Sequence, residues 1–139
     1  MNAATELARS PLLYLGATAA VMAAAARVRF LESRYDFDEM VGRLRRPSRG
    51  SRRSSLAVAS ARVSDRLLLL LPPFGMGPCL KRSLMLLHLW SGWGYEVKLH
   101  MGVRPGRDGP EGHAWLTVDD PDLQQLAGSP SGCEEAIAL

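Results

Sequence analysis

The sequence has few of the residues that disulfide-stapled and metal-binding domains need. Two cysteines, Cys79 and Cys133, and three histidines occur in 139 residues, and they do not have the spacing of a zinc site. Small secreted scaffolds carry far more cysteine, so we expect free thiols in a reducing compartment, the cytoplasm. No phosphate-cradling glycine motif is present either, and we expect neither a metal nor another cofactor.

Long, strongly apolar runs are also missing. A helix that spans a bilayer needs about 20 predominantly apolar residues, and the nearest candidate, residues 11–26, is rich in alanine rather than leucine or phenylalanine. It continues without a break into the charged stretch 27–40. We therefore expect a soluble helix and no stable membrane insertion, with an exported or membrane-contacting segment as the alternative.

Excess positive charge is concentrated in one stretch. The chain has 17 lysines and arginines against 14 acidic residues, and six of the arginines fall within residues 43–53. Such a run is usually a solvated loop, but it could attract nucleic acid, an acidic peptide or a membrane surface. It lacks interleaved aromatic residues and any nucleic-acid-binding signature, so we expect no nucleic-acid partner and favour an acidic peptide or protein surface.

The expected elements are helical in the first half of the chain and include strands only in the second half. Composition predicts one domain over residues 1–139, with a helical region over 11–45, a basic loop over 46–55, a core over 56–122 and a C-terminal tail over 123–139. The helical region should contain two helices with a break near "RYDFD". Runs of helices followed by strands define an α+β fold. In the helix expected after the basic loop, the apolar residues predicted to lie roughly on one side are Leu56, Val58, Val63, Leu67 and Leu70.

Two alternating segments predict adjacent strands. In "YEVKLHMGV", 95–103, Val97, Leu99 and Met101 share one face, and in "HAWLTV", 113–118, His113, Trp115 and Thr117 share one face. The intervening "RPGRDGPEG" is predicted to be a turn. The C-terminal "GSPSGCEEAIAL" has little strand-forming capacity.

Cys79 follows Pro78 at the start of a predicted helix that ends near Trp90. A thiol attacks a carbonyl carbon as the thiolate, and the unpaired N–H groups and dipole of a helix N-terminus favour that form. Arg82, three residues on, could add positive charge, and the N–H of Cys79 could hold an oxyanion. From position alone, Cys79 is either a buried structural cysteine or a nucleophile.

A nucleophilic thiol needs a general base. We favour His113, which opens a strand after a glycine-rich turn, over His88 and His100, for which we expect ordinary surface or partly buried roles. The imidazole in turn needs an orienting group. The acids available after His113 are Asp119, Asp120 and Asp122, each of which could equally be an ordinary turn aspartate.

Residues 77–120 closely resemble the transglutaminase-like cysteine proteases of lasso-peptide biosynthesis, the C-terminal type of the B protein. In that family a helix opens with Cys-Leu, a strand ends in Gly-Val-Arg, and the next strand begins His-Ala-Trp and ends Val-Asp. The matching motifs here are Cys79-Leu80, Arg82-Ser83-Leu84, Gly94, Gly102-Val103-Arg104, His113-Ala114-Trp115 and Val118-Asp119.

The resemblance implies a papain/transglutaminase-like fold and removal of the leader from a ribosomally made precursor peptide. Cys79 would form a thioester with the last residue of the leader, and His113 would take the thiol proton and later activate water. Arg82 and Trp115 would contact the substrate. The implied partners are the precursor, a small leader-recognition protein and an ATP-dependent lasso cyclase.

One departure concerns the acid that orients the histidine. In the family it usually lies on the strand after His-Ala-Trp, where this sequence has "LQQLAG" with Gln124 and Gln125. Either an aspartate of 119–122 is displaced into that role, or a glutamine serves as a neutral acceptor and leaves a weaker base. A non-catalytic peptide-binding module with the same fold is the alternative function.

Overall fold

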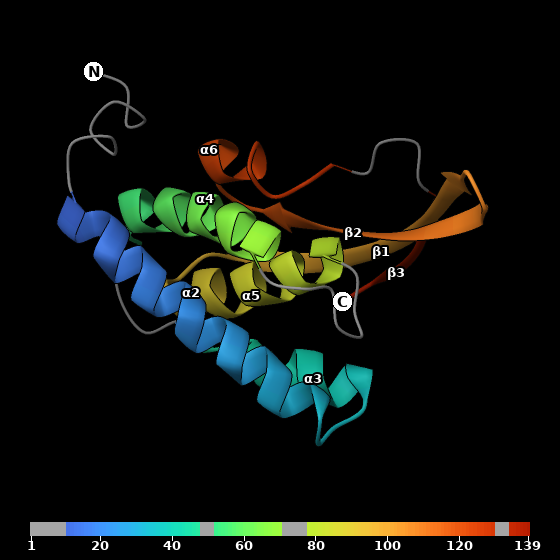
Figure 1. Ribbon diagram of the computed structural model, residues 1–139, viewed down its shortest axis with the longest axis horizontal. Helices are drawn as coiled ribbons and strands as arrows, with labels where there is room; N and C mark the ends of the chain where they lie inside the picture. Colours follow the sequence, from blue (N-terminus) through green and yellow to red (C-terminus); the bar gives the residue numbers. More distant parts are fainter. Residues whose placement is uncertain (1–10, 48–51, 71–77, 130–133) are drawn as a thin grey trace.

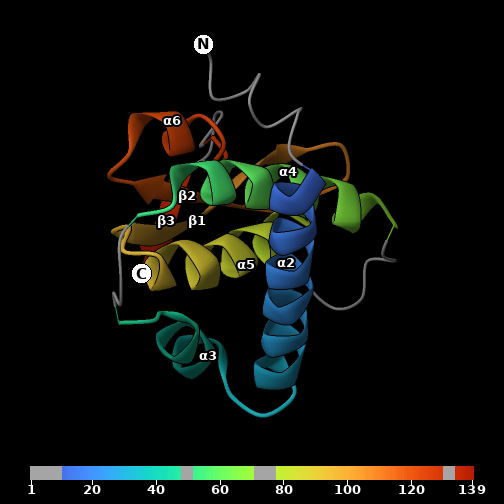
Figure 2. The ribbon, with the colours of Figure 1, turned by 90° about the vertical axis from the view of Figure 1, so that its left-hand side faces the viewer.

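The computed structural model describes residues 11–47, 52–70, 78–129 and 134–139. Over these residues the chain forms five helices and three strands. The helix α5 packs on the sheet, and α2 and α4 pack on α5 and on each other. Figure 1 shows the hairpin end of the sheet extending beyond these helices, and Figure 2 shows α2 crossing α4 and α5. The elements are α2 (Pro11–Glu32), α3 (Phe37–Leu44), α4 (Ser54–Leu70), α5 (Pro78–Gly92), β1 (Val97–Gly106), β2 (Gly109–Val118), α6 (Pro121–Gln124) and β3 (Glu134–Ala138).

The break expected near "RYDFD" is confirmed and has a local cause. Asp36 is the N-cap of α3, and its carboxylate accepts a hydrogen bond of 2.9 Å from the N–H of Glu39. An aspartate at this position satisfies one of the helix's unpaired donors and starts a new helix in a new direction. The chain therefore turns here, and α3 buries Met40, Val41 and Leu44.

The first helix, α2, is long and apolar enough to cross a membrane by length and composition, with a mean hydropathy of 1.4 over 18 residues. Core helices of soluble proteins and signal sequences have the same character. Here one side of α2 packs in the protein core through Val21, Ala24, Val28 and Leu31.

The helix α4 begins at Ser54, so the basic loop ends earlier than the predicted residue 55; residues 48–51 of that loop lie outside the described part. The prediction of a shared side on α4 is confirmed in part, because four of its five residues pack against the core and one does not. Leu70 is 82% exposed, and Leu56, Val58, Val63 and Leu67 are half-buried. The fully buried positions are small ones: Ala57, Ala59, Ser60, Ala61 and Ser64.

Small residues face the core because α4 lies against the large side chains of α5. The indole N–H of Trp90 donates to the carbonyl oxygen of Ala57 at 3.3 Å and to Oγ of Ser60 at 3.2 Å. The Ser60 hydroxyl in turn donates to the Ala57 carbonyl at 2.6 Å. A buried Trp needs such an acceptor, and only small residues let the two helices come this close.

The central helix, α5, is buried over most of its length, and the prediction that it starts at Cys79 and ends near Trp90 agrees with its bounds. His88 is not the surface or partly buried residue that we expected, since it is only 4% exposed. Its Nδ1 lies 2.8 Å from the carbonyl oxygen of Leu44. Because a carbonyl only accepts, Nδ1 carries the proton, and the hydrogen bond ties α5 to the end of α3.

Burial of His88 predicts an acid-sensitive fold. Burial lowers the pKa of His88 below its ordinary 6.5, and Arg46 and Arg27 add to this, while the Leu44 hydrogen bond opposes it. Below pH 6.5 the unfolded chain therefore binds a proton that the folded chain resists. We expect the free energy of unfolding to fall as the pH drops below 6.5, by at most about 1.4 kcal/mol per pH unit from this group.

Urea unfolding between about pH 8 and about pH 5 measures this effect. In His88→Gln, the part of the pH dependence of the free energy of unfolding that His88 contributes should disappear. If the free energy of unfolding depends on pH identically in the parent and in His88→Gln, the prediction is contradicted.

The sheet has the strand order β2-β1-β3, with both pairs antiparallel. The alternation predicted for both strands is confirmed: Val97, Leu99, Ala114 and Leu116 belong to the core. The predicted turn over 104–112 is too long, because β1 runs to Gly106 and β2 starts at Gly109. Gly109 has a φ of 115°, a value that favours glycine, so the reversal is confined to Arg107 and Asp108.

The prediction of little strand-forming capacity at the C-terminus is wrong for residues 134–138, which form β3. The N–H groups of Leu99 and Leu139 each donate to the other's carbonyl oxygen at 2.7 Å. Pairing with the free edge of β1 supplies the hydrogen bonds that local sequence preference does not.

Candidate active site

Cys79 lies in the first turn of α5, immediately after Pro78. It is a half-buried free thiol. Proline is favoured at the first helical position because its missing N–H needs no partner there. The sequence therefore places the thiol among the N-terminal N–H groups of a helix, which can stabilise a negative charge.

His113 lies on β2, opposite Gly102 of β1. Its ring stacks on the indole of Trp115, with centroids 5.9 Å apart and planes 23° apart. His100 stacks on the same indole at 5.6 Å, and its Nε2 lies 2.8 Å from Oγ1 of Thr117. Trp115 itself is only 5% exposed, so in this arrangement it supports imidazole rings and offers little surface to a substrate.

The thiol and the imidazole come from two elements that pack on one another, α5 and β2. Among the described residues, no hydrogen bond joins Cys79 to His113. Nε2 of His113 is instead 2.7 Å from the carbonyl oxygen of Ser129. In the absence of substrate, catalytic hydrogen bonds are often long and form only in the substrate complex.

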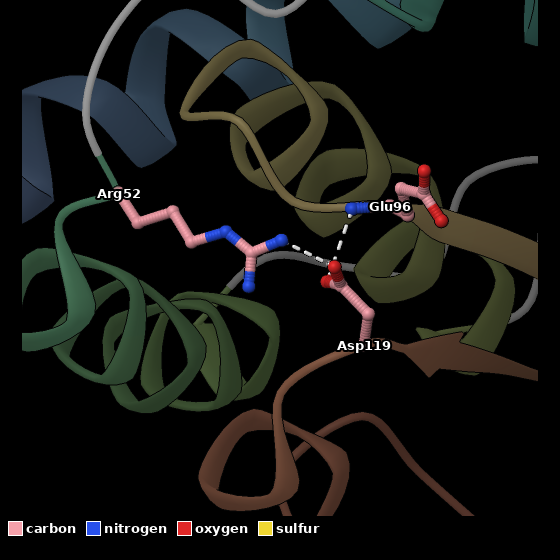
Figure 3. A network of polar contacts seen from close by, with 3 residues as sticks. All are labelled: Arg52, Glu96 and Asp119. Atoms are coloured by element: carbon pink, nitrogen blue, oxygen red, sulfur yellow. Dashed lines mark hydrogen bonds and ion pairs between the residues drawn. The ribbon is translucent and has the colours of Figure 1, made fainter.

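Asp119 holds the open end of the β1–β2 hairpin, as Figure 3 shows. One carboxylate oxygen accepts from the N–H of Glu96 at 3.1 Å, and the other forms an ion pair with Arg52. The Arg52 guanidinium also lies 5.0 Å from the ring centroid of Tyr95. The contacts of Asp119 thus join the end of β2, the start of β1 and the segment before α4.

The other two candidate acids belong to α6. Asp120 is its N-cap, and its Oδ1 accepts from the N–H groups of Asp122 and Leu123 at 2.9 and 3.2 Å. Asp122 is exposed in the first turn. The contacts of both residues suit helix initiation.

Gln124 has partners of its own as well. Its Oε1 accepts from the N–H of Val118 at 2.9 Å, and its amide nitrogen donates to the carbonyl of Leu116 at 3.1 Å. The side-chain amide therefore pairs with the outer edge of β2 as a neighbouring strand would. Gln125 is exposed.

Arg82 links three parts of the chain. Its Nε donates to Asp65 of α4 at 2.6 Å, and its Nη2 donates to the carbonyl oxygen of Leu126 at 2.6 Å. With 16% of its side chain exposed, it connects α4, α5 and the segment after α6.

A groove of about 540 Å³ with several charged side chains in its lining lies where α3 ends and the two long strands meet. Three cations line it, Arg45, Arg46 and Lys98, together with Glu96 and Asp119. Since Asp119 is already paired with Arg52, the positive charge of the groove is in excess. Among the described residues, no group of three or more His, Cys, Asp and Glu side chains could hold a metal ion.

The fold and these residues define an α+β protein in which a helix N-terminus carries a thiol and the sheet beside it carries a histidine. The family model of the transglutaminase-like superfamily matches residues 19–124, more than half of the chain, and the chain belongs to this superfamily. The superfamily often includes cysteine proteases. No curated protein and no solved structure matches the chain significantly.

The partner of His113 is the feature of the site that sequence reasoning missed. The sequence indicates an orienting acid among the side chains, but the group at hydrogen-bond distance from Nε2 is a main-chain carbonyl. Every residue carries such a carbonyl, so no residue type signals it. The only local hint is Gly128, which precedes Ser129 and allows an unusual backbone conformation there.

Proposed function

We propose that the protein is a cysteine peptidase that removes the leader from a ribosomally made lasso-peptide precursor. The observation that carries the proposal is the superfamily match, within which Cys79 begins α5 and His113 lies on β2, a strand that packs on α5. The motifs over residues 77–120 that resemble lasso leader peptidases support the narrower assignment.

The chemistry would proceed through a thioester. The Cys79 thiolate adds to the carbonyl carbon before the cut, and His113 accepts the thiol proton and passes it to the departing amine. Water, deprotonated by His113, then hydrolyses the thioester and releases the leader. The N–H groups at the start of α5 would hold the oxyanion in both steps.

A non-catalytic peptide-binding module is the second candidate, and one observation favours it. Cys79 and His113 share no hydrogen bond, and Asp119 and Asp120 are engaged in contacts away from the imidazole. A module of this kind would keep the fold and bind the leader without cutting it.

Mass spectrometry of a precursor peptide distinguishes the two candidates. The peptide is incubated with this protein and its leader-recognition partner, and a thiol-reactive probe is applied with and without the peptide. Cleavage at one site, with peptide-dependent protection of Cys79 from the probe, supports the peptidase. Leader binding without cleavage would overturn it in favour of the module.

Within this proposal, the basic groove meets an acidic segment of the leader or of the leader-recognition protein. The groove carries three cations, Arg45, Arg46 and Lys98. Among its described lining residues the acids are Glu96 and Asp119, and Asp119 is paired with Arg52. Clustered cations attract carboxylates over several ångströms, and salt screens that attraction.

Replacing Arg45, Arg46 and Lys98 together with glutamine should weaken leader binding about tenfold at low salt. Each exposed ion pair between one of these cations and a leader carboxylate contributes about 0.5 kcal/mol to the binding free energy. In the variant, the affinity for the leader should also depend much less on salt concentration. Isothermal titration at two salt concentrations measures this dependence. Arg66→Gln, an exposed arginine on α4 outside the groove, is the matched control. Equal affinities for the triple variant and the parent would rule out this groove.

A further inference from the structure

The geometry points to the main-chain carbonyl of Ser129 as the group that orients His113, in the place where a carboxylate was expected. This inference rests on the proposed function in one respect, the role of His113 as the base. The position of its proton can be tested without any activity.

The hydrogen bond assigns the tautomer of the imidazole. Nε2 of His113 lies 2.7 Å from the Ser129 carbonyl oxygen, and a carbonyl oxygen can only accept. Nε2 therefore carries the proton, and the lone pair of the neutral ring is on Nδ1. Nδ1 is then the atom that takes the thiol proton, and the resulting imidazolium is held at Nε2 by the same carbonyl.

The segment that carries this carbonyl is anchored along the outer edge of β2. The side-chain amide of Gln124 pairs with the backbone of Leu116 and Val118, and the N–H of Leu116 donates to the carbonyl of Ala127 at 2.9 Å. Two residues further on, Ser129 reaches the side chain of His113. The chain after α6 thus follows β2 back towards the histidine.

Gly128 makes this path possible. Its φ is 92°, which residues with a side chain rarely adopt, and a Cβ there would lie 3.2 Å from Cβ and 3.5 Å from Cα of Trp115. The backbone therefore passes directly over Trp115, the residue whose ring stacks on His113. Trp115 fixes the plane of the imidazole, and Ser129 fixes its rotation within that plane.

The three candidate aspartates make their contacts elsewhere in the part of the chain that the structure describes. Among the described residues, none of the candidate acids bonds to His113: Asp119 is held by Arg52 and Glu96, and Asp120 caps α6. Among the described contacts, the Ser129 carbonyl is therefore the group that orients the imidazole.

Long-range ¹H–¹⁵N correlation spectra of the full-length labelled protein test the assignment, at an alkaline pH where imidazoles are neutral. The signals of His113 are identified by their loss in His113→Gln. In the parent we expect the proton on Nε2. In Gly128→Ala we expect signals averaged between the two tautomers, because the carbonyl is displaced. Gly16→Ala is the control, since its added Cβ meets nothing within 4 Å.

In the cleavage assay, Gly128→Ala should lower the rate about tenfold to a hundredfold, the usual effect of losing one hydrogen bond to a charged group, while Gly16→Ala should not. A proton on Nδ1 in the parent, or an unchanged tautomer in Gly128→Ala, would overturn the inference. If Gly128→Ala does not fold, the tautomer observed in the parent is by itself the test of the inference. Since the spectra need no substrate, an inactive parent would refute the peptidase without deciding the tautomer.

Discussion

Cys79→Ala is expected to abolish cleavage of the precursor. In the proposed mechanism the variant lacks the atom that would form the thioester, and loss of the nucleophile in enzymes of this type lowers turnover by about 10⁴-fold or more. The half-buried position of Cys79 in the first turn of α5 tolerates the smaller alanine. Leader binding should therefore persist, and mass spectrometry of the peptide with parallel binding measurements separates the two effects.

The matched control is Cys133→Ala, which removes the only other thiol and for which we expect parental cleavage. Loss of cleavage in Cys133→Ala but not in Cys79→Ala would reverse the assignment of the nucleophile. Retained cleavage in both variants would show that the protein does not use a cysteine at all.

Trp90→Ala is expected to cause the largest loss of stability, about 3–5 kcal/mol in the free energy of unfolding. The indole is 0% exposed and donates to Ala57 and Ser60 of α4. Its removal leaves a large cavity between two helices that small residues cannot fill. Since domains are stable by only about 5–15 kcal/mol, much of the folded population at elevated temperature would be lost.

Denaturant unfolding of Trp90→Ala beside Leu69→Ala measures this difference. Leu69 lies on α4 and is 85% exposed, so its truncation should change the free energy of unfolding by less than about 0.5 kcal/mol. Equal effects of the two substitutions would contradict the described contact between α4 and α5.

Features that depend on neighbouring residues could be predicted from the sequence. Pro78 and the apolar run after it define the start of α5, which places Cys79 at a helix N-terminus. The break near Asp36 follows from its capping side chain. Alternation was enough to predict the two long strands and the shared face of His113 and Trp115.

The remaining features depend on contacts between distant parts of the chain. α4 buries Ala57 and Ser60 rather than its leucines because Trp90 occupies the space beside it. β3 exists because β1 has a free edge to pair with.

The sequence by itself determined which residues carry the thiol and the imidazole. Tertiary structure decided what surrounds the imidazole, because Ser129 reaches His113 through its backbone and only after Gln124 and Gly128 have directed the chain along β2. A main-chain carbonyl acquires such a role from its position in space, which no residue type encodes.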